Sequence, residues 1–166
     1  AMRGGAQGVS AINTILGMIG INMKNLRPMP TVEGHSTPGG YSYLAVKPIA
    51  LRMVSELARW NPDMDISAMG GVTNSNDAFE HILVGGSTVQ VCTGAMLQGF
   101  DMVGELQEGL EAHLEKHGFE SLRDAVGHSL QYFTTHHHLV ELQAAKRALK
   151  AAAMANKDTA RTERTV

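Results

Sequence analysis

The sequence predicts an α/β fold with neighbouring parallel strands, and three observations lead to this prediction. Two short runs, 65–71 and 88–94, combine apolar or β-branched residues with a glycine turn, as buried strands that end in tight loops do. Between them, residues 73–84 have the apolar spacing of a helix, with Asn74 or Ser75 as its cap. Strand, turn, helix and strand in this order form a parallel unit, so both glycine turns should lie at one edge of the sheet.

The composition limits the classes of function. The 166 residues suffice for one domain with a core, and the net charge of −2 provides no basic field for nucleic acid. No apolar run approaches the roughly 18 residues of a membrane span, and no signal peptide is recognisable, so we expect a cytoplasmic protein. The single cysteine, Cys92, excludes an internal disulfide or a cysteine-rich cluster in this chain. Residues 1–8 resemble the end of a helix, so we expect a piece of a longer protein, or one partner of a split one.

A first strand is expected at 9–12, directly before Asn13 and Thr14. Side chains at the carboxyl ends of strands face the active site in α/β folds. The Asn13 amide and the Thr14 hydroxyl could therefore recognise a planar ring with alternating carbonyl and N–H groups. The alternative is an Asn-Thr turn in which the side chains bond only to their own backbone.

Residues 15–46 keep no helix or strand period, because glycine and proline interrupt every pattern. We interpret this segment as a loop over the active-site face, with a small hairpin near 29–32. Gly39 and Gly40 would let the backbone approach a ligand closely. A simple surface excursion without function is the alternative.

Further helices are expected around the strands. One opens at Lys47-Pro48 and ends at Asn61-Pro62, since proline fits a first turn and stops a helix that precedes it. Lys47 could neutralise a phosphate or be a solvated surface charge. A second helix is expected at 100–116, and a short third one begins at 121–124. A last helix begins at Thr134 or Thr135.

The glycine turns form the expected binding site. Gly70 and Gly71 follow one strand, and Cys92 and Thr93 follow the next. Backbone N–H groups at such turns suit a phosphate, so we expect a phosphate-bearing cofactor there. Cys92 is interpreted as a small residue that permits close packing, rather than as a nucleophile.

No metal site is expected. The run His136–His138 places three consecutive residues on a helix, where they point in three directions and cannot share one ion. His81, His113 and His128 are expected on helix surfaces.

Five motifs in a fixed order resemble the dihydroorotate and dihydropyrimidine dehydrogenase family over residues 4–130. The likeness is greatest to the flavin-bearing subunits of bacterial NAD-dependent dihydropyrimidine dehydrogenases. The motifs are residues 10–14, 39–42, 45–52, 70–72 and 83–94. The resemblance implies a TIM barrel, of which this chain would hold the C-terminal portion, about strands six to eight, plus C-terminal helices. The expected domains are the C-terminal part of an FMN-binding barrel at 1–130, a helical extension at 131–155 and a disordered tail at 156–166.

The resemblance also implies roles for the site residues. None in this chain is expected to be catalytic, since the family's general acid lies in the part that would precede it, with the first five strands. By resemblance, the pyrimidine ring would bind Asn13 and Thr14, the flavin would contact Gly39 and Gly40, and the FMN phosphate would bind Gly70, Gly71, Cys92 and Thr93.

The implied activity is FMN-dependent reduction of the C5–C6 double bond of uracil or thymine, a step of pyrimidine catabolism. Electrons from NAD(P)H would come through a partner subunit with FAD and iron–sulfur clusters, because this chain lacks the cysteines of an iron–sulfur segment. The chain would also need the N-terminal half of the barrel, or a companion chain, to complete the site. The alternatives are a dihydroorotate dehydrogenase of pyrimidine biosynthesis and an inactive barrel fragment that lacks its N-terminal half.

Overall fold

A parallel sheet of three strands forms the centre of the computed structural model, which describes residues 1–163. The strands β1 (Gly8–Ala11), β6 (Asp65–Met69) and β7 (Thr88–Gln90) lie in the order β1-β6-β7. Register pairs Ala11 with Ala68 and Met69 with Gln90, so the three strands end at the same edge. The predicted α/β fold with parallel strands is confirmed.

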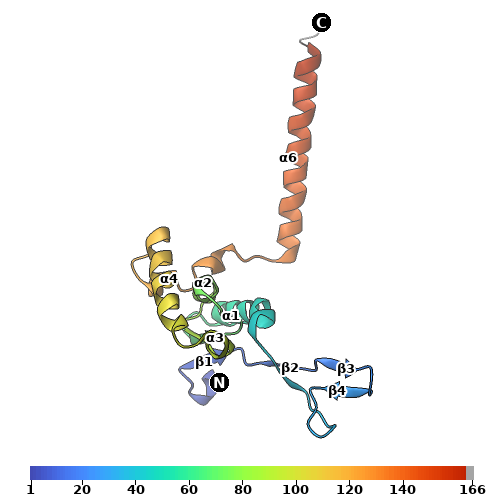
Figure 1. Ribbon diagram of the computed structural model, residues 1–166. Helices are drawn as coiled ribbons and strands as arrows, with labels where there is room; N and C mark the ends of the chain where they lie inside the picture. The colour runs from blue at the N-terminus through green and yellow to red at the C-terminus, as the bar shows by residue number, and fades with distance from the viewer. Residues whose placement is uncertain (164–166) are drawn as a thin grey trace. The chain divides into compact units, whose positions relative to one another are not determined.

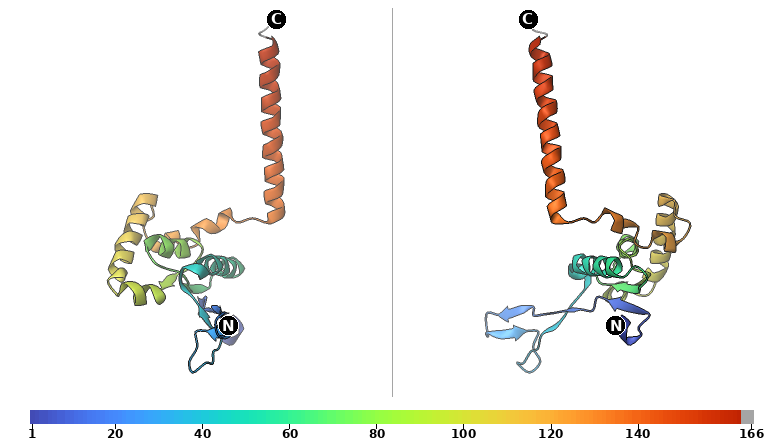
Figure 2. Two further views of the ribbon diagram at one scale, coloured as in Figure 1. Left: turned by 45° about the vertical axis from the view of Figure 1, so that its right-hand side comes forward. Right: turned by 180° about the vertical axis from the view of Figure 1, so that it is seen from behind.

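Helices α1 (Lys47–Trp60) and α2 (Ser75–Leu83) cover one face of this sheet (Figures 1 and 2). Ile66 and Ala68 of β6 are fully buried in one cluster with Val54 and Ala58 of α1, while the alternate residue Ser67 points to the other face. The bounds of α1 and α2 lie within about two residues of those predicted. In chain order the helical elements of the first unit are η1 (Met2–Gly4), η2 (Tyr43–Val46), α1 (Lys47–Trp60), α2 (Ser75–Leu83), α3 (Thr93–Gln98), α4 (Met102–His117), α5 (Leu122–Ala125) and η3 (His128–Tyr132).

Helix α2 begins and ends where its sequence specifies. The Asn74 side chain accepts a hydrogen bond of 3.1 Å from the Asp77 N–H, which is the predicted cap. After the helix, Gly85 has a φ of +111°, and a Cβ there would collide with Ala58 of α1. Glycine at this position therefore lets the chain turn tightly against α1.

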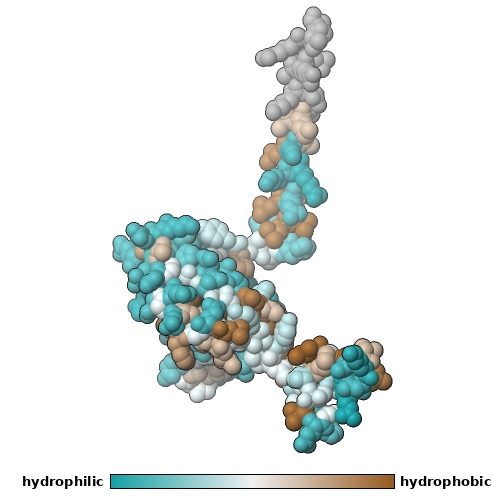
Figure 3. Space-filling view, in the orientation of Figure 1, coloured by the Kyte–Doolittle hydropathy of each residue, from teal (hydrophilic) through white to brown (hydrophobic). Residues whose placement is uncertain are grey.

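The segment that was expected to be an irregular loop contains two antiparallel strand pairs. Strand β2 (Ile15–Gly17) pairs with β5 (Gly39–Tyr41), and β3 (Gly20–Asn22) pairs with β4 (Arg27–Met29). The hairpin turn lies at 22–27 rather than at 29–32, because the side chains of Asn22 and Asn25 accept hydrogen bonds from the Lys24 and Arg27 N–H groups. We call residues 15–41 the arm. Its exposed apolar side chains, seen in brown in Figure 3, include Leu16, Met18, Ile19 and Met23.

The chain divides into two compact units, Ala1–Gln131 and a second that starts at Tyr132. The second contains α6 (His136–Glu163), at whose start the Thr135 hydroxyl accepts a hydrogen bond of 3.2 Å from the His138 N–H. The helix passes residue 155, after which a disordered tail was expected. The end of that tail, 164–166, lies outside the described residues, and the proposed domain limits stay predictions. None of the helices described here combines the length and the apolar character that crossing a bilayer requires.

Candidate functional site

A cavity of about 380 Å³ lies at the carboxyl edge of the sheet. It is lined by the segments that follow β1, β6 and β7, together with η2. The edge thus gathers residues as far apart in the sequence as Ile12 and Gly94. Six of the eight predicted site residues line this cavity, namely Asn13, Thr14, Gly70, Gly71, Cys92 and Thr93.

The remaining two predicted residues lie elsewhere. Gly39 and Gly40 line a separate cavity on the arm, with Leu16 and Tyr41. A Cβ at Gly40 would lie only 2.5 Å from Thr14 Oγ1, so the close approach of Thr14, the residue before β2, explains the glycine there. The structure therefore does not bring Gly39 and Gly40 into the sheet-edge cavity, and their contact with a flavin stays a prediction.

Asn13 and Thr14 form the local turn that was one of the two interpretations. Asn13 Oδ1 accepts a hydrogen bond of 2.8 Å from the Thr14 N–H. Both residues are exposed at the cavity. Within residues 1–163, no protein group bonds the Asn13 Nδ2 or the Thr14 hydroxyl. The local bond therefore orients the Asn13 side chain and leaves donors for a ligand.

The Gly70–Gly71 turn exposes backbone to the cavity. Its φ angles, +128° and +76°, lie in the region that favours glycine. A Cβ at Gly70 would lie 2.7 Å from Ala50 Cβ, and one at Gly71 would lie 2.6 Å from Lys47 Cβ, so α1 packs directly on the turn. Within residues 1–163, no carbonyl accepts a hydrogen bond from the amides of Gly71 or Thr93. Both amides are therefore available to an anion.

Three residues that line the cavity, Ser42, Tyr43 and Gln90, were not predicted as site residues. The hydroxyls of Ser42 and Thr93 lie 3.3 Å apart and join the start of η2 to α3. Tyr43 follows Ser42 and has a φ of +69°. Gln90 Nε2 donates to Ser10 Oγ at 3.1 Å and to Ser67 Oγ, which fixes its side chain across the three strands. The sequence does contain a signal for Gln90: it is a polar residue between two valines of a strand. This alternation places the Gln90 side chain on the face opposite to the helices.

Cys92 is exposed and lines the cavity, although it was expected to be a tightly packed residue. The packing role falls instead on Gly94, where a Cβ would lie 2.7 Å from the Val72 carbonyl oxygen. No group of three or more His, Cys, Asp or Glu side chains in residues 1–163 is arranged to hold a metal ion.

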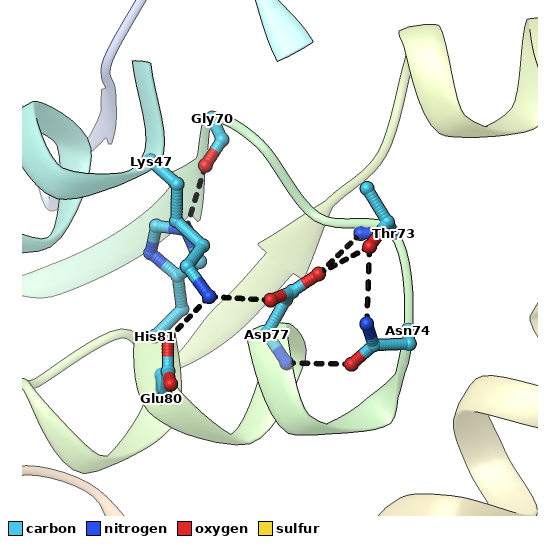
Figure 4. Close-up of polar contacts among 7 residues, drawn as sticks. All are labelled: Lys47, Gly70, Thr73, Asn74, Asp77, Glu80 and His81. Carbon is cyan, nitrogen blue, oxygen red and sulfur yellow. Dashed lines mark hydrogen bonds and ion pairs between the residues drawn. The ribbon is translucent and has the colours of Figure 1, made fainter. Parts of the chain in front are cut away.

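Lys47 belongs to an ion-pair network beneath the turn (Figure 4). Its ammonium group pairs with Asp77 and, at 2.8 Å, with Glu80, so it is only partly exposed and is not free for a phosphate. Asp77 Oδ2 also accepts hydrogen bonds from the Thr73 N–H at 2.9 Å and from the Thr73 hydroxyl at 2.6 Å. The network therefore ties α1, α2 and the 70–74 turn together.

Both main partners of this network are charged at neutral pH. Burial lowers the pKa of Lys47, but the hydrogen bonds and charges of Asp77 and Glu80 raise it overall. Burial alone would raise the pKa of Asp77, whereas the hydrogen bonds from Lys47 and Thr73 lower it overall.

His81 is fully buried, and its expected place on a helix surface is therefore wrong. It lies on the side of α2 that faces the turn, three residues after the buried Ala78. His81 Nε2 lies 3.1 Å from the Gly70 carbonyl oxygen. Burial lowers the pKa of His81, and the hydrogen bond to Gly70 and the nearby carboxylates only partly oppose this. The imidazole is therefore neutral at pH 7.

The free energy of unfolding should decrease as the pH falls from 7 to 5. The unfolded chain takes up a proton at His81 near the ordinary pKa of 6.5, whereas the folded chain does so only at lower pH. The loss is at most ~1.4 kcal/mol per pH unit for one such group. Protonation of Asp77 lowers the free energy of unfolding further, but only below the ordinary Asp pKa of 3.8. Urea unfolding at pH 5, 6 and 7 measures the slope, and His81→Gln should make it shallower; equal slopes in both proteins would contradict the assignment.

His113 and Phe79 belong to an aromatic cluster that lies away from the sheet edge. Their rings stack at 4.7 Å between centroids, and His128 meets Phe119 edge-on at 5.1 Å. His113 is half-buried rather than a surface residue.

A family model described as dihydroorotate dehydrogenase matches residues 2–114. The chain is 49% identical over 148 residues to the chloroplastic dihydropyrimidine dehydrogenase (NADP(+)) of Arabidopsis thaliana, which covers 86% of this chain and 35% of that protein. It is 43% identical over 130 residues to the NAD-dependent dihydropyrimidine dehydrogenase subunit PreA of Escherichia coli (strain K12), with 76% and 31% covered. Identity to the catalytic subunit of dihydroorotate dehydrogenase B (NAD(+)) of Pyrococcus horikoshii is 41% over 131 residues, with 79% and 41% covered. The chain thus spans about a third of the length of these relatives.

Proposed function

This chain belongs to the dihydroorotate dehydrogenase family, as its motifs predicted, and from that premise we propose that it is part of an FMN-dependent enzyme that reduces the C5–C6 double bond of uracil or thymine. One observation carries the proposal: the sheet-edge cavity holds the expected ring-binding residues and the expected phosphate-binding turns together. Pyrimidine catabolism is the corresponding role. The cytoplasmic location stays a prediction.

We propose that β1, β6 and β7 are about the sixth to eighth strands of a TIM barrel. In the described residues, β1 and β7 each pair with β6 alone, so each has an open edge. Open parallel edges call for further strands. The N-terminal half of the barrel, from a longer chain or a companion chain, would supply them. Without it this chain would be an inactive fragment.

The residues at the turns fit the phosphate of FMN. The Gly71 and Thr93 amides have no protein acceptor in residues 1–163, and the Thr93 hydroxyl lies beside them in the same cavity. Glycine at 70 and 71 permits the positive φ angles of a turn whose backbone lines the cavity, so backbone donors can reach an anion. When bound, FMN supplies the hydride chemistry.

The other residues of the site would bind and orient the pyrimidine. The Asn13 amide nitrogen can donate to a ring carbonyl, and the Thr14 hydroxyl can donate or accept. Their position at the end of β1 fixes the ring relative to the phosphate turns, and such positioning lowers the barrier to the reaction. Electrons from NAD(P)H would arrive through a partner subunit with FAD and iron–sulfur clusters, since one cysteine cannot bind a cluster.

Replacing Asn13 by alanine in the complete enzyme tests the substrate site. We expect kcat/KM for uracil to fall at least about tenfold, because the ring loses a buried hydrogen bond, while FMN content changes less than about twofold. Asn76→Ala, an exposed position on α2, is the matched control. If lost flavin accounts for all the lost activity, the role of Asn13 is wrong.

The second candidate activity is oxidation of dihydroorotate, and the 41% identity to the Pyrococcus horikoshii subunit is the observation behind it. Parallel assays with uracil and dihydroorotate, on a preparation whose absorbance spectrum shows bound flavin, separate the two. Turnover of dihydroorotate without turnover of uracil or thymine would replace the first proposal with the second. A colourless complete protein would exclude both.

A further inference from the structure

We propose that His81 is a positioning residue: its imidazole holds the Gly70 carbonyl so that the Gly71 N–H points at the bound phosphate. This inference rests on the proposed binding of an FMN phosphate at the sheet edge. His81 has no contact with the cavity, and it acts through the peptide bond that it anchors.

The geometry of one peptide group carries the argument. The Gly70 carbonyl and the Gly71 N–H belong to the same peptide, which is trans, so the two groups point in opposite directions. His81 Nε2 binds the carbonyl oxygen at 3.1 Å from the interior side, beneath the turn (Figure 4). The Gly71 N–H must then point away from His81, on the side where the turn lines the cavity.

This peptide needs an anchor because glycine lies on both of its sides. Reversing it requires rotation about ψ of Gly70 and φ of Gly71, and glycine tolerates most values of both angles. A reversed peptide would turn its carbonyl dipole toward the anion and would repel it. With the His81 bond in place, reversal would bury the imidazole N–H without an acceptor, which is unfavourable.

The hydrogen bond also defines the state of the imidazole. A carbonyl oxygen only accepts, so Nε2 carries the hydrogen. Nδ1 is buried and has no partner in residues 1–163, so it is without a proton when the ring is neutral. The charged groups around the ring are Lys47 from α1 and Asp77 and Glu80 from α2, and Lys47 pairs with both carboxylates.

The test compares FMN with riboflavin, which lacks the phosphate, as ligands of the complete protein. Titration of flavin fluorescence gives both Kd values, and their ratio isolates the phosphate contribution. We expect His81→Leu to reduce the preference for FMN about tenfold or more, because an amide–phosphate bond is lost or replaced by repulsion. His81→Gln, whose amide can donate at a similar distance, should keep the preference within about threefold. Thermal unfolding without flavin shows which variants are folded.

The outcomes separate this inference from the proposed function. A wild-type protein that binds FMN no better than riboflavin contradicts the phosphate site itself. A wild-type preference that persists in folded His81→Leu, or disappears in folded His81→Gln, overturns the role of His81. If neither variant folds, the long-range 1H–15N spectrum of the wild-type histidines decides. It should show a neutral Nε2–H form at pH 7 and above; an Nδ1–H form, or a charged ring at pH 7, would overturn the inference.

Discussion

Replacing Gly71 by valine is expected to reduce the free energy of unfolding by about 3 kcal/mol or more and to abolish FMN retention. Gly71 has a φ of +76°, which a β-branched residue rarely adopts. The new Cβ would lie 2.6 Å from Lys47 Cβ and 2.9 Å from the Tyr43 carbonyl oxygen. Since both neighbours belong to η2 and α1, the valine would displace the turn from α1 rather than fill the cavity. Urea unfolding and flavin content after gel filtration measure the two effects.

Gly104→Val is the matched control for this substitution. Gly104 lies in α4 with no heavy atom within 4 Å of a new Cβ, so its unfolding free energy should stay within about 0.5 kcal/mol of wild type. Equal urea midpoints for both variants would show that α1 does not pack on the turn as described. A destabilised Gly71→Val protein that still retains FMN would instead contradict the phosphate site.

The sheet edge was predictable because its determinants are local. A glycine-bearing turn follows each of two short strands, and Asn74 caps the helix between them, so the order of elements places both turns at one edge. The strands, the turn and the helix cap are each specified by residues that are near one another in the sequence.

The arm and His81 were not predictable in this way. The pairing of β2 with β5 joins residues more than 20 positions apart, and no periodicity in three-residue strands reports it. His81 is buried on α2, where its ring bonds the Gly70 carbonyl of the turn above it, a contact that hydrophobic spacing does not encode. Lys47 likewise resembles a surface residue until Asp77 and Glu80 are placed opposite to it.

Asp77→Ala should be the second strongly destabilising substitution, with a loss of about 3 kcal/mol in the free energy of unfolding. Asp77 is almost fully buried and satisfies both the Lys47 ammonium and the Thr73 N–H. Its removal leaves a half-covered cation with one exposed partner, Glu80, and an amide without an acceptor. Asp77→Asn keeps an acceptor for Thr73 but loses the charge, so its loss should be smaller.

A double-mutant cycle with Lys47→Met distinguishes the contribution of the Lys47–Asp77 ion pair from that of the hydrogen bonds that Asp77 accepts from Thr73. If the ion pair dominates, the loss in unfolding free energy of the double variant should be smaller than the summed losses of the two single variants. We expect a difference of about 1–3 kcal/mol. The exposed pair Arg52–Glu56 on α1 is the control, because a solvated ion pair on a helix surface contributes little, and Glu56→Ala should leave the urea midpoint unchanged. Strict additivity of the first pair would mean that Asp77 acts only through Thr73. The 70–74 turn would then be held to α2 alone, and the packing of α1 on Gly70 and Gly71 would have to keep the phosphate-binding turn in place without the help of Lys47.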